Sequence, residues 1–359
     1  MRFIASTFAI LLLLAASPGH AVEAGAYVAL NKAAIEKHIL PRYDALVTAT
    51  ANLNDAAKDY CAVPATKPIV DLQAAFGKTM DAWQDIQHVR FGPVDWFFRS
   101  QRFAFWPDPR NTIGKQMAEL LSRHQAGSVD PELLAKGSVA TQGLPALERL
   151  IFGEDASKLK SGTDAAYRCK YVEAIALNLA QMAKETQAAW RDGGDKAFAA
   201  VMQDGSKSDA PYREPQEATL ELFKALYLAI ELAADHKLAR PLGAALKDAR
   251  PRLSESWRSE RSLRNIQRNL AAAQDLYLNS FSAAVADKAV DTAIRDGLGK
   301  SVTAANAIRV PLETAVQDAK ARPQAEALAA ELLALKKLLG DRLPPALDIP
   351  VGFNALDGD

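Results

Sequence analysis

The sequence is poor in the residues that most often build metal and thiol chemistry. Its 359 residues include two cysteines and five histidines. Because no second cysteine lies at short spacing to either Cys61 or Cys169, a cysteine-based zinc site is not expected. The sequence also lacks G-x-S-x-G, G-x-x-x-x-G-K-S/T, G-x-G-x-x-G and H-E-x-x-H. The nucleophile-elbow, phosphate-loop, dinucleotide-binding and zincin signatures are therefore excluded.

A surplus of charge of either sign is also missing. Forty-three Lys and Arg residues balance 43 Asp and Glu residues, for a formal net charge of +0. A protein that grips nucleic acid or an anionic membrane normally carries a basic surplus, so neither is an expected partner. The content of 49% hydrophobic and 24% charged residues is typical of a globular protein, and the length favours two domains.

Alternating β-branched runs are almost absent, whereas strong helix formers are abundant. In the stretch Asp71–His88, apolar residues recur at helical spacing, as Leu72, Phe76, Met80 and Trp83. This pattern predicts an all-α fold. Further amphipathic helices are predicted at Tyr171–Trp190, Leu220–Leu238, Leu263–Leu278 and Ala325–Leu339.

The first 21 residues have the pattern of a secretory signal peptide. Arg2 precedes the apolar run Phe8–Ala16, and small residues precede a cut after Ala21. The run is too short to span a membrane, and no later segment is long and apolar enough to do so. Secretion, and a periplasmic location, are therefore expected.

Glycine and proline residues interrupt the helical pattern between Arg191 and Gln216. We expect two helical bundles separated there. The predicted organisation is a signal peptide at 1–21, an N-terminal bundle at 22–192, a linker at 193–215, a C-terminal bundle at 216–345 and a tail at 346–359.

The two cysteines suit an oxidising compartment. A bond between Cys61 and Cys169 closes a loop whose entropy in the unfolded chain is worth about 4–5 kcal/mol. We expect this disulfide to staple the N-terminal bundle. The alternative is two unpaired buried thiols.

Two regions combine arginine with features of a binding surface. The first spans residues 90–110 and holds seven aromatic residues, and the second spans 250–268 and holds six arginines. Arginine forms planar, bidentate contacts with carboxylates and phosphates, so these regions predict an anion-binding or partner-binding cleft between the bundles. The alternative is that the aromatics are core and the arginines pair with acids on neighbouring helices. The candidate residues are Arg90, Arg99, Arg102, Trp106, Arg110, Arg258, Arg261 and Arg264.

A polar stripe occupies the other face of the Asp71–His88 helix. Asp81, Asp85 and His88 follow one another at helical spacing, opposite Phe76 and Trp83. A metal site is conceivable there, but the position favours a solvated face.

The segment Thr141–Gly153 places a carboxylate on an apolar helix face. Pro145 suits a first helical turn, and Glu148 follows Leu144 by four residues and precedes Ile151 by three. A glutamate in such a position pairs with an arginine or serves as a ligand.

This segment resembles the signature motif of the imelysin family, also known as peptidase family M75. The motif is G-x-H-x-x-E, followed by an apolar run that ends in glycine. Gly143 and Glu148 match the motif, and Pro145 stands at the histidine position. Further similar segments are Trp83–Pro93, Phe105–Arg110, Lys237–Leu242, Ser256–Ser262 and Gly352–Asp359.

The resemblance implies two four-helix-bundle-like domains, a bacterial periplasmic or surface setting, an association with iron uptake and its envelope partners, and a site near the motif helix where the domains meet. The resemblance also implies peptidase activity, because the family is classified as a peptidase family. Catalytic zinc needs about three protein ligands, and Pro145 has no donor atom. We therefore expect a non-enzymatic binding protein for a metal ion, such as iron, or for an anionic small ligand, with Glu148 as the motif's only candidate metal ligand.

Two alternatives remain: a metallopeptidase with a different ligand set, and an interaction module without a small ligand. For Glu148 itself we expect an ion pair with an arginine from residues 90–110 or 258–264. Loss of one partner from such a buried pair costs about 3–5 kcal/mol.

Overall fold

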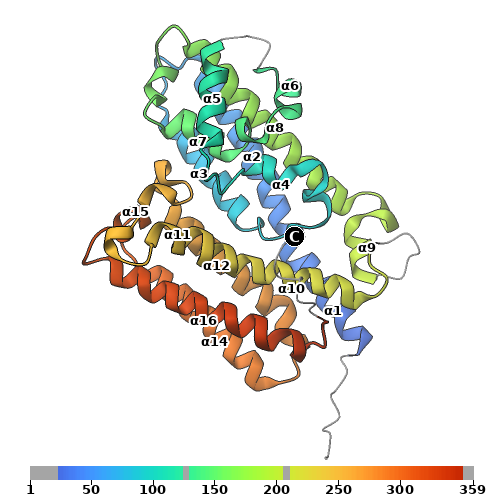
Figure 1. Cartoon of the computed structure of the whole chain (residues 1–359). Helices are drawn as coiled ribbons and strands as arrows, with labels where there is room; N and C mark the ends of the chain where they lie inside the picture. The colour runs from blue at the N-terminus through green and yellow to red at the C-terminus, as the bar shows by residue number, and fades with distance from the viewer. Residues whose placement is uncertain (1–22, 124–128, 205–210, 351–359) are drawn as a thin grey trace, which may run out of the picture.

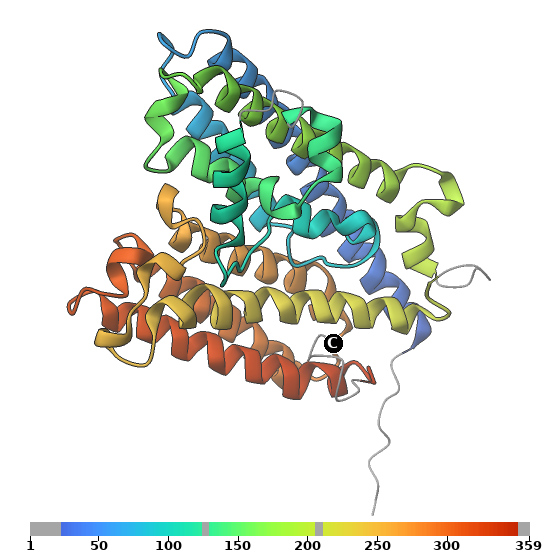
Figure 2. The ribbon, with the colours of Figure 1, turned by 45° about the horizontal axis from the view of Figure 1, so that its top comes forward.

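The computed structural model describes residues 23–123, 129–204 and 211–350, and the predicted signal peptide lies outside this range. The described residues form helices and no strands, which confirms the all-α prediction. Two helical layers lie one above the other (Figures 1 and 2). None of the helices within these three ranges is long and apolar enough to cross a membrane.

The upper layer is built around three long helices from the first half of the chain. They are α2 (Leu40–Ala62), α3 (Val70–Gln84) and α8 (Ala165–Arg191). Their contact buries Phe76, Trp83 and Trp190 almost completely, so aromatic area supplies much of the apolar driving force. Shorter helices complete this layer: α4 (Arg99–Phe103), α5 (Thr112–Arg123), α6 (Pro131–Lys136), α7 (Leu144–Phe152) and α9 (Phe198–Asp204).

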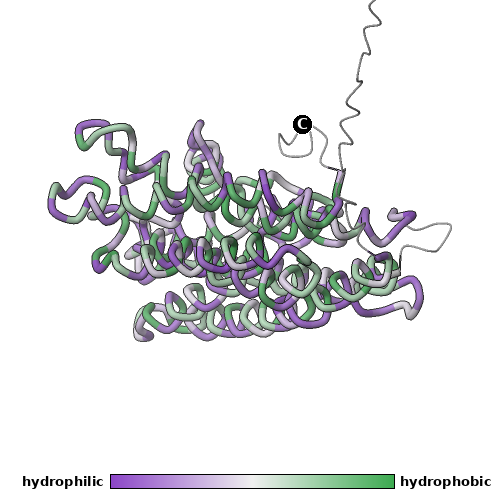
Figure 3. Tube along the Cα trace, turned by 90° about the horizontal axis from the view of Figure 1, so that it is seen from below, coloured by the Kyte–Doolittle hydropathy of each residue, from purple (hydrophilic) through white to green (hydrophobic). Residues whose placement is uncertain are grey.

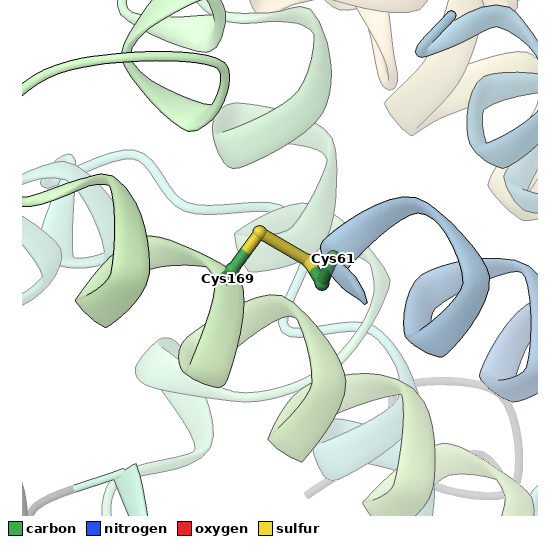
Figure 4. The surroundings of a disulfide bond; sticks show 2 residues. All are labelled: Cys61 and Cys169. Carbon is green, nitrogen blue, oxygen red and sulfur yellow. A yellow bond between two sulfur atoms is a disulfide. The ribbon is translucent and has the colours of Figure 1, made fainter. Parts of the chain in front are cut away.

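The predicted disulfide is present. Cys61 lies in the last turn of α2 and Cys169 in the first turns of α8, with 5.4 Å between their Cα atoms (Figure 4). The bond joins two helices that pack along their length, and it closes the predicted loop of 108 residues within the upper layer.

The lower layer consists of four long helices from the second half of the chain. Leucine repeats at helical spacing in the last of them, and Leu328, Leu332, Leu335 and Leu339 are buried against the neighbours. Along each helix hydrophobic and hydrophilic stretches alternate, as expected for one packed face and one exposed face (Figure 3). The four are α10 (Pro215–Glu231), α12 (Ser262–Leu276), α14 (Lys288–Ala307) and α16 (Arg322–Ala346), with α11 (Arg240–Leu242), α13 (Ser282–Ala284) and α15 (Leu312–Ala315) between them.

One long helical stretch connects the layers. It begins as α1 (Ala24–Ala34), continues through the π-helical η1 (Ile35–Ile39) and becomes α2. Whereas α2 packs in the upper layer, α1 lies against α10 of the lower layer (Figure 1). The Tyr27 hydroxyl donates to the Leu347 carbonyl at 2.8 Å, so the first helix is tied to the end of the lower layer.

Two further π-helical segments occur in the described chain, η8 (Leu232–Ala239) after α10 and η12 (Tyr277–Phe281) after α12. The remaining short elements are 3₁₀ turns: η2 (Gly92–Val94), η3 (Trp96–Phe98), η5 (Val139–Thr141), η6 (Ala156–Leu159), η7 (Gly194–Lys196), η9 (Leu246–Asp248), η10 (Pro251–Leu253) and η11 (Trp257–Ser259).

The expected solvated stripe on the helix at 71–88 is wrong. α12 covers this face of α3, and Asp81 forms ion pairs with Arg264 of α12 and with Arg261, which directly precedes that helix. Asp85 pairs with Arg268, and His88 is 1% exposed. Periodicity had indicated a polar face correctly, but in this two-layer fold the polar face meets a second polar face instead of water.

Candidate functional site

The motif helix α7 begins at a glycine that no other residue could replace without strain. Gly143 has φ +88°, and a Cβ built on it lies 2.3 Å from the Arg102 carbonyl oxygen. Pro145 occupies the first turn of α7, where its missing N–H is not needed. The glycine and the proline thus set the direction in which α7 begins within the upper layer.

Glu148 lies on the buried side of α7, with 5% of its surface exposed. Its Oε1 accepts hydrogen bonds from the Ser259 backbone N–H at 3.0 Å and from the Ser259 hydroxyl at 2.7 Å. The expected burial is therefore confirmed. The expected arginine ion pair is wrong: among the described residues, no arginine or lysine reaches ion-pair distance of this carboxylate.

Burial raises the pKa of Glu148, and the two hydrogen bonds from Ser259 oppose that rise. The surroundings do not fit catalytic zinc. Pro145 offers no donor atom, Ser259 already uses Oε1, and the nearby Arg149 and Arg258 are cations. In the described chain no group of three or more His, Cys, Asp or Glu side chains has a metal-binding arrangement.

Ser259 reaches Glu148 from a short loop of the lower layer. The loop is η11, and it is flanked by Ser256 at φ 55° and Glu260 at φ 54°, two non-glycine residues in the left-handed region. Such conformations persist only where the surroundings hold them. Glu148 holds one side of the loop, and on the other side the buried Glu255 accepts from Lys237 at 2.9 Å.

A cavity of about 380 Å³ opens between α7 and this loop, where the two layers meet. Its volume is within the range of small-molecule sites. Glu148 and Pro145 line it from the upper layer, and Trp257 and Arg258 from the lower layer. A second cavity of about 650 Å³ adjoins it and shares Arg149, Arg252, Trp257 and Arg258. Both cavities lie between the two layers, and a binding role for them stays a prediction.

Most of the predicted arginines are engaged elsewhere. Arg99 pairs with Glu185 at 2.8 Å, and Arg261 and Arg264 both pair with Asp81. Arg102 donates to the Gln142 and Asn178 side-chain oxygens, each at 3.0 Å. Arg90 and Arg110 are exposed and line neither cavity, whereas Trp106 and Arg258 line the smaller one.

Three cleft arginines were not among the candidates: Arg149, Arg240 and Arg252. They come from α7, α11 and η10, and their separation in sequence leaves no local pattern. Two of them did carry a signal: Arg252 belongs to the arginine-rich region 250–268, and Arg149 directly follows Glu148.

The aromatic residues of 90–110 divide between core and surface. Phe103 is buried and stacks on Trp83 with ring centroids 4.8 Å apart. In contrast, Phe97 and Phe98 are 74% and 70% exposed. The alternative that these aromatics are core therefore applies to only part of the segment.

A histidine pair is buried where η1 passes α3 and α12. The Nε2 atoms of His38 and His88 are 2.9 Å apart, and His38 Nδ1 lies 2.8 Å from Asp275 Oδ2. Burial lowers the pKa of His38 to about 4, and burial together with the neighbouring His38 holds the pKa of His88 well below its usual value. Since Nε2 faces Nε2, the contact needs a proton on only one of these two nitrogens, which two neutral rings supply when His38 carries its own proton on Nδ1.

Comparison with known protein families assigns the chain to one of them. The family model for imelysin matches residues 39–339. The chain belongs to the imelysin family. In the imelysin motif of this chain, the glutamate binds the η11 loop, and a proline takes the histidine position.

Among curated proteins, iron-regulated protein A of Synechococcus elongatus is 20% identical over 253 residues, 70% of this chain and 64% of that protein. An imelysin-like structure from Psychrobacter arcticum superimposes with a TM-score of 0.76 at 20% identity, covering 93% of this chain and 99% of the other. An iron-regulated protein A precursor from Parabacteroides distasonis gives 0.77 at 16% identity, with coverage of 93% and 97%. The imelysin fold therefore extends over almost the whole chain.

Proposed function

We propose that this chain is a secreted, periplasmic binding protein of the imelysin family, which takes its ligand in the cleft at Glu148 and acts in iron or other metal-linked uptake. Two of the similar proteins carry names that refer to iron regulation, which supports the link to iron. The signal-peptide pattern of residues 1–21 supports secretion.

One observation carries the choice of a binding protein over a peptidase. The motif glutamate, Glu148, accepts hydrogen bonds at Oε1 from the backbone N–H and the hydroxyl of Ser259. The histidine position of the motif is occupied by Pro145. Glu148 therefore builds a wall of the cleft by fixing the η11 loop. A zinc peptidase needs about three ligands and a polarised water, and this donor set does not supply them.

Two measurements on the full chain test the proposal. Equilibrium dialysis against ferrous iron, ferric iron and ferric citrate should show saturable binding of at least one of them. Incubation with reduced, carboxymethylated lysozyme, an unfolded polypeptide, should show no cleavage that a chelator abolishes. Chelator-sensitive cleavage would establish the rival metallopeptidase.

A matched pair of variants connects the result to the cleft. Glu148→Ala frees the η11 loop and should weaken iron binding. Glu132→Ala removes an exposed glutamate of α6 and should leave binding unchanged. Equal effects of the two variants would place the bound iron outside the cleft.

A further inference from the structure

The smaller cavity contains cations that the protein itself does not neutralise. Four arginines line it: Arg149, Arg240, Arg252 and Arg258. Arg149 donates to the Asn111 side-chain oxygen at 2.6 Å. For the other three, no carboxylate of the described chain lies within ion-pair distance. Glu148 and Glu154 act on Arg258 only through space.

The acids of the same cavity, in contrast, are already used. Asp108 accepts from the backbone N–H groups of Thr112 and Ile113 at 2.7 and 2.8 Å, and so caps α5. Glu255 pairs with Lys237, and Glu148 accepts from Ser259. The carboxylates of this cavity are therefore already bonded to other groups of the protein, whereas its arginine guanidiniums line the open space.

The arrangement around Trp257 leaves the arginine edges available. The guanidinium carbon of Arg258 lies 4.2 Å from the Trp257 ring centroid, and that of Arg252 lies 5.3 Å from it. Cation–π contact uses the face of a guanidinium. Its N–H edge stays free for bidentate hydrogen bonds to a carboxylate or phosphate.

One buried hydroxyl also lacks a partner. Ser254 is 2% exposed and lines the cavity, and its Oγ makes no hydrogen bond to any residue that the structure describes. A buried hydroxyl without a partner is costly. A ligand oxygen in the cavity would satisfy it.

We infer that the cleft binds a small multivalent oxyanion, a ligand with two or more carboxylate or phosphate groups, held by Arg252 and Arg258 with Arg149, Arg240 and Ser254 around it. The inference rests on the proposed function, because it names the ligand class of the same cleft. An anionic metal chelate belongs to this class.

The η11 loop gives Glu148 a defined part in this site. Ser259 directly follows Arg258, so the two hydrogen bonds to Glu148 fix the segment that carries Trp257 and Arg258. Glu148 is accordingly a positioning residue: it does not contact the anion but fixes the position of the Arg258 guanidinium.

Isothermal titration of the full chain with citrate and with inorganic pyrophosphate tests the inference, with acetate at equal ionic strength as the monovalent comparison. We expect saturable binding of citrate, pyrophosphate or both, and none of acetate. Binding of citrate alone assigns a carboxylate ligand, and binding of pyrophosphate alone assigns a phosphate ligand. The affinity should fall as salt is added, because the contacts are charged.

Variants locate the bound anion. Arg258→Gln and Arg252→Gln should each weaken binding by about 10-fold or more. Both arginines make no hydrogen bond within the described structure, so the variants should fold. Arg342→Gln, which removes an exposed arginine of α16, should leave binding unchanged.

Two results would overturn the inference. One is that citrate and pyrophosphate bind no better than acetate, and the other is that neither arginine variant weakens their binding. If ferrous or ferric ion alone binds while both polyanions fail, the oxyanion site is wrong and the iron-linked binding protein stands. If a polyanion binds but chelator-sensitive cleavage occurs, the site stands and the proposed function is wrong.

Discussion

Two arginine-rich surfaces lie between the layers, and they differ in how their charges are satisfied. At the contact of α3 with α12, Arg261 and Arg264 share Asp81, and Arg268 pairs with Asp85. In the cleft, Arg252 and Arg258 have no carboxylate partner among the described residues. The first surface is therefore complete without a ligand and joins the layers, whereas the second is complete only when an anion enters.

The largest expected effect concerns the buried pair of His38 and His88 and the pH dependence of stability that it causes. Because the folded pKa of His38 is about 4 and the unfolded value is near 6.5, the unfolded state binds more protons between these pH values. The free energy of unfolding should therefore fall as the pH drops through this window. The loss from His38 alone is about 3 kcal/mol.

Urea unfolding of wild type and His38→Gln at pH 7, 5.5 and 4.5 checks this. The variant should lose part of the pH dependence, whatever its stability at pH 7. Equal slopes for the two proteins would show that folding does not shift the pKa of His38, which would contradict its burial as a neutral imidazole.

The next effect distinguishes the role of Glu148. Glu148→Ala leaves the Ser259 N–H and hydroxyl without their acceptor, and should lower the free energy of unfolding by about 2–3 kcal/mol. Glu148→Gln keeps an oxygen acceptor and removes a buried charge, so it should change stability by less than about 1 kcal/mol. Chemical denaturation measures both. If Glu148→Gln lowered the free energy of unfolding by about 3–5 kcal/mol, Glu148 would form a buried ion pair with an arginine after all.

A smaller effect is expected at the α3–α12 contact. Asp81→Ala leaves the partly buried Arg261 unpaired and should cost about 2 kcal/mol, without changing citrate or pyrophosphate affinity. Asp341→Ala breaks the exposed pair with Lys337 and should cost less than about 0.5 kcal/mol. If Asp81→Ala weakened anion binding as strongly as Arg258→Gln, the two surfaces would not be separate.

The smallest effect on stability is expected for the arginines of the cleft when no ligand is present. Arg252→Gln removes a cation that makes no hydrogen bond and lies among other arginines, so stability without added anion should change by less than about 0.5 kcal/mol. Thermal unfolding in a chloride buffer measures it. A marked destabilisation would mean that Arg252 is structural.

Much of the fold could be predicted from local pattern, because its signals are local. The stripe Leu72 to Trp83 predicted a helix at 71–88, and α3 spans Val70–Gln84 before the chain turns. Gly143 and Glu148 identified the motif helix and the family. The domain boundaries stay a prediction, although α1 packs with the lower layer.

The site could be predicted only in part, because its charges meet through tertiary structure. Asp81 looked solvated since a helix periodicity cannot distinguish water from the arginines of α12. Arg149, Arg240 and Arg252 come from three separate elements, and no spacing connects them. A buried glutamate was expected to find an arginine, but a backbone N–H and a serine hydroxyl satisfy it instead.

A crystal structure of the full chain grown with citrate and another grown with pyrophosphate would test the open cleft most directly. The account predicts, in at least one of them, anionic oxygens about 3 Å from the guanidinium nitrogens of Arg252 and Arg258, with Ser254 donating to the ligand. The account would be contradicted if, in both crystals, Arg252 and Arg258 formed ion pairs with carboxylates of the protein and the cleft held only water.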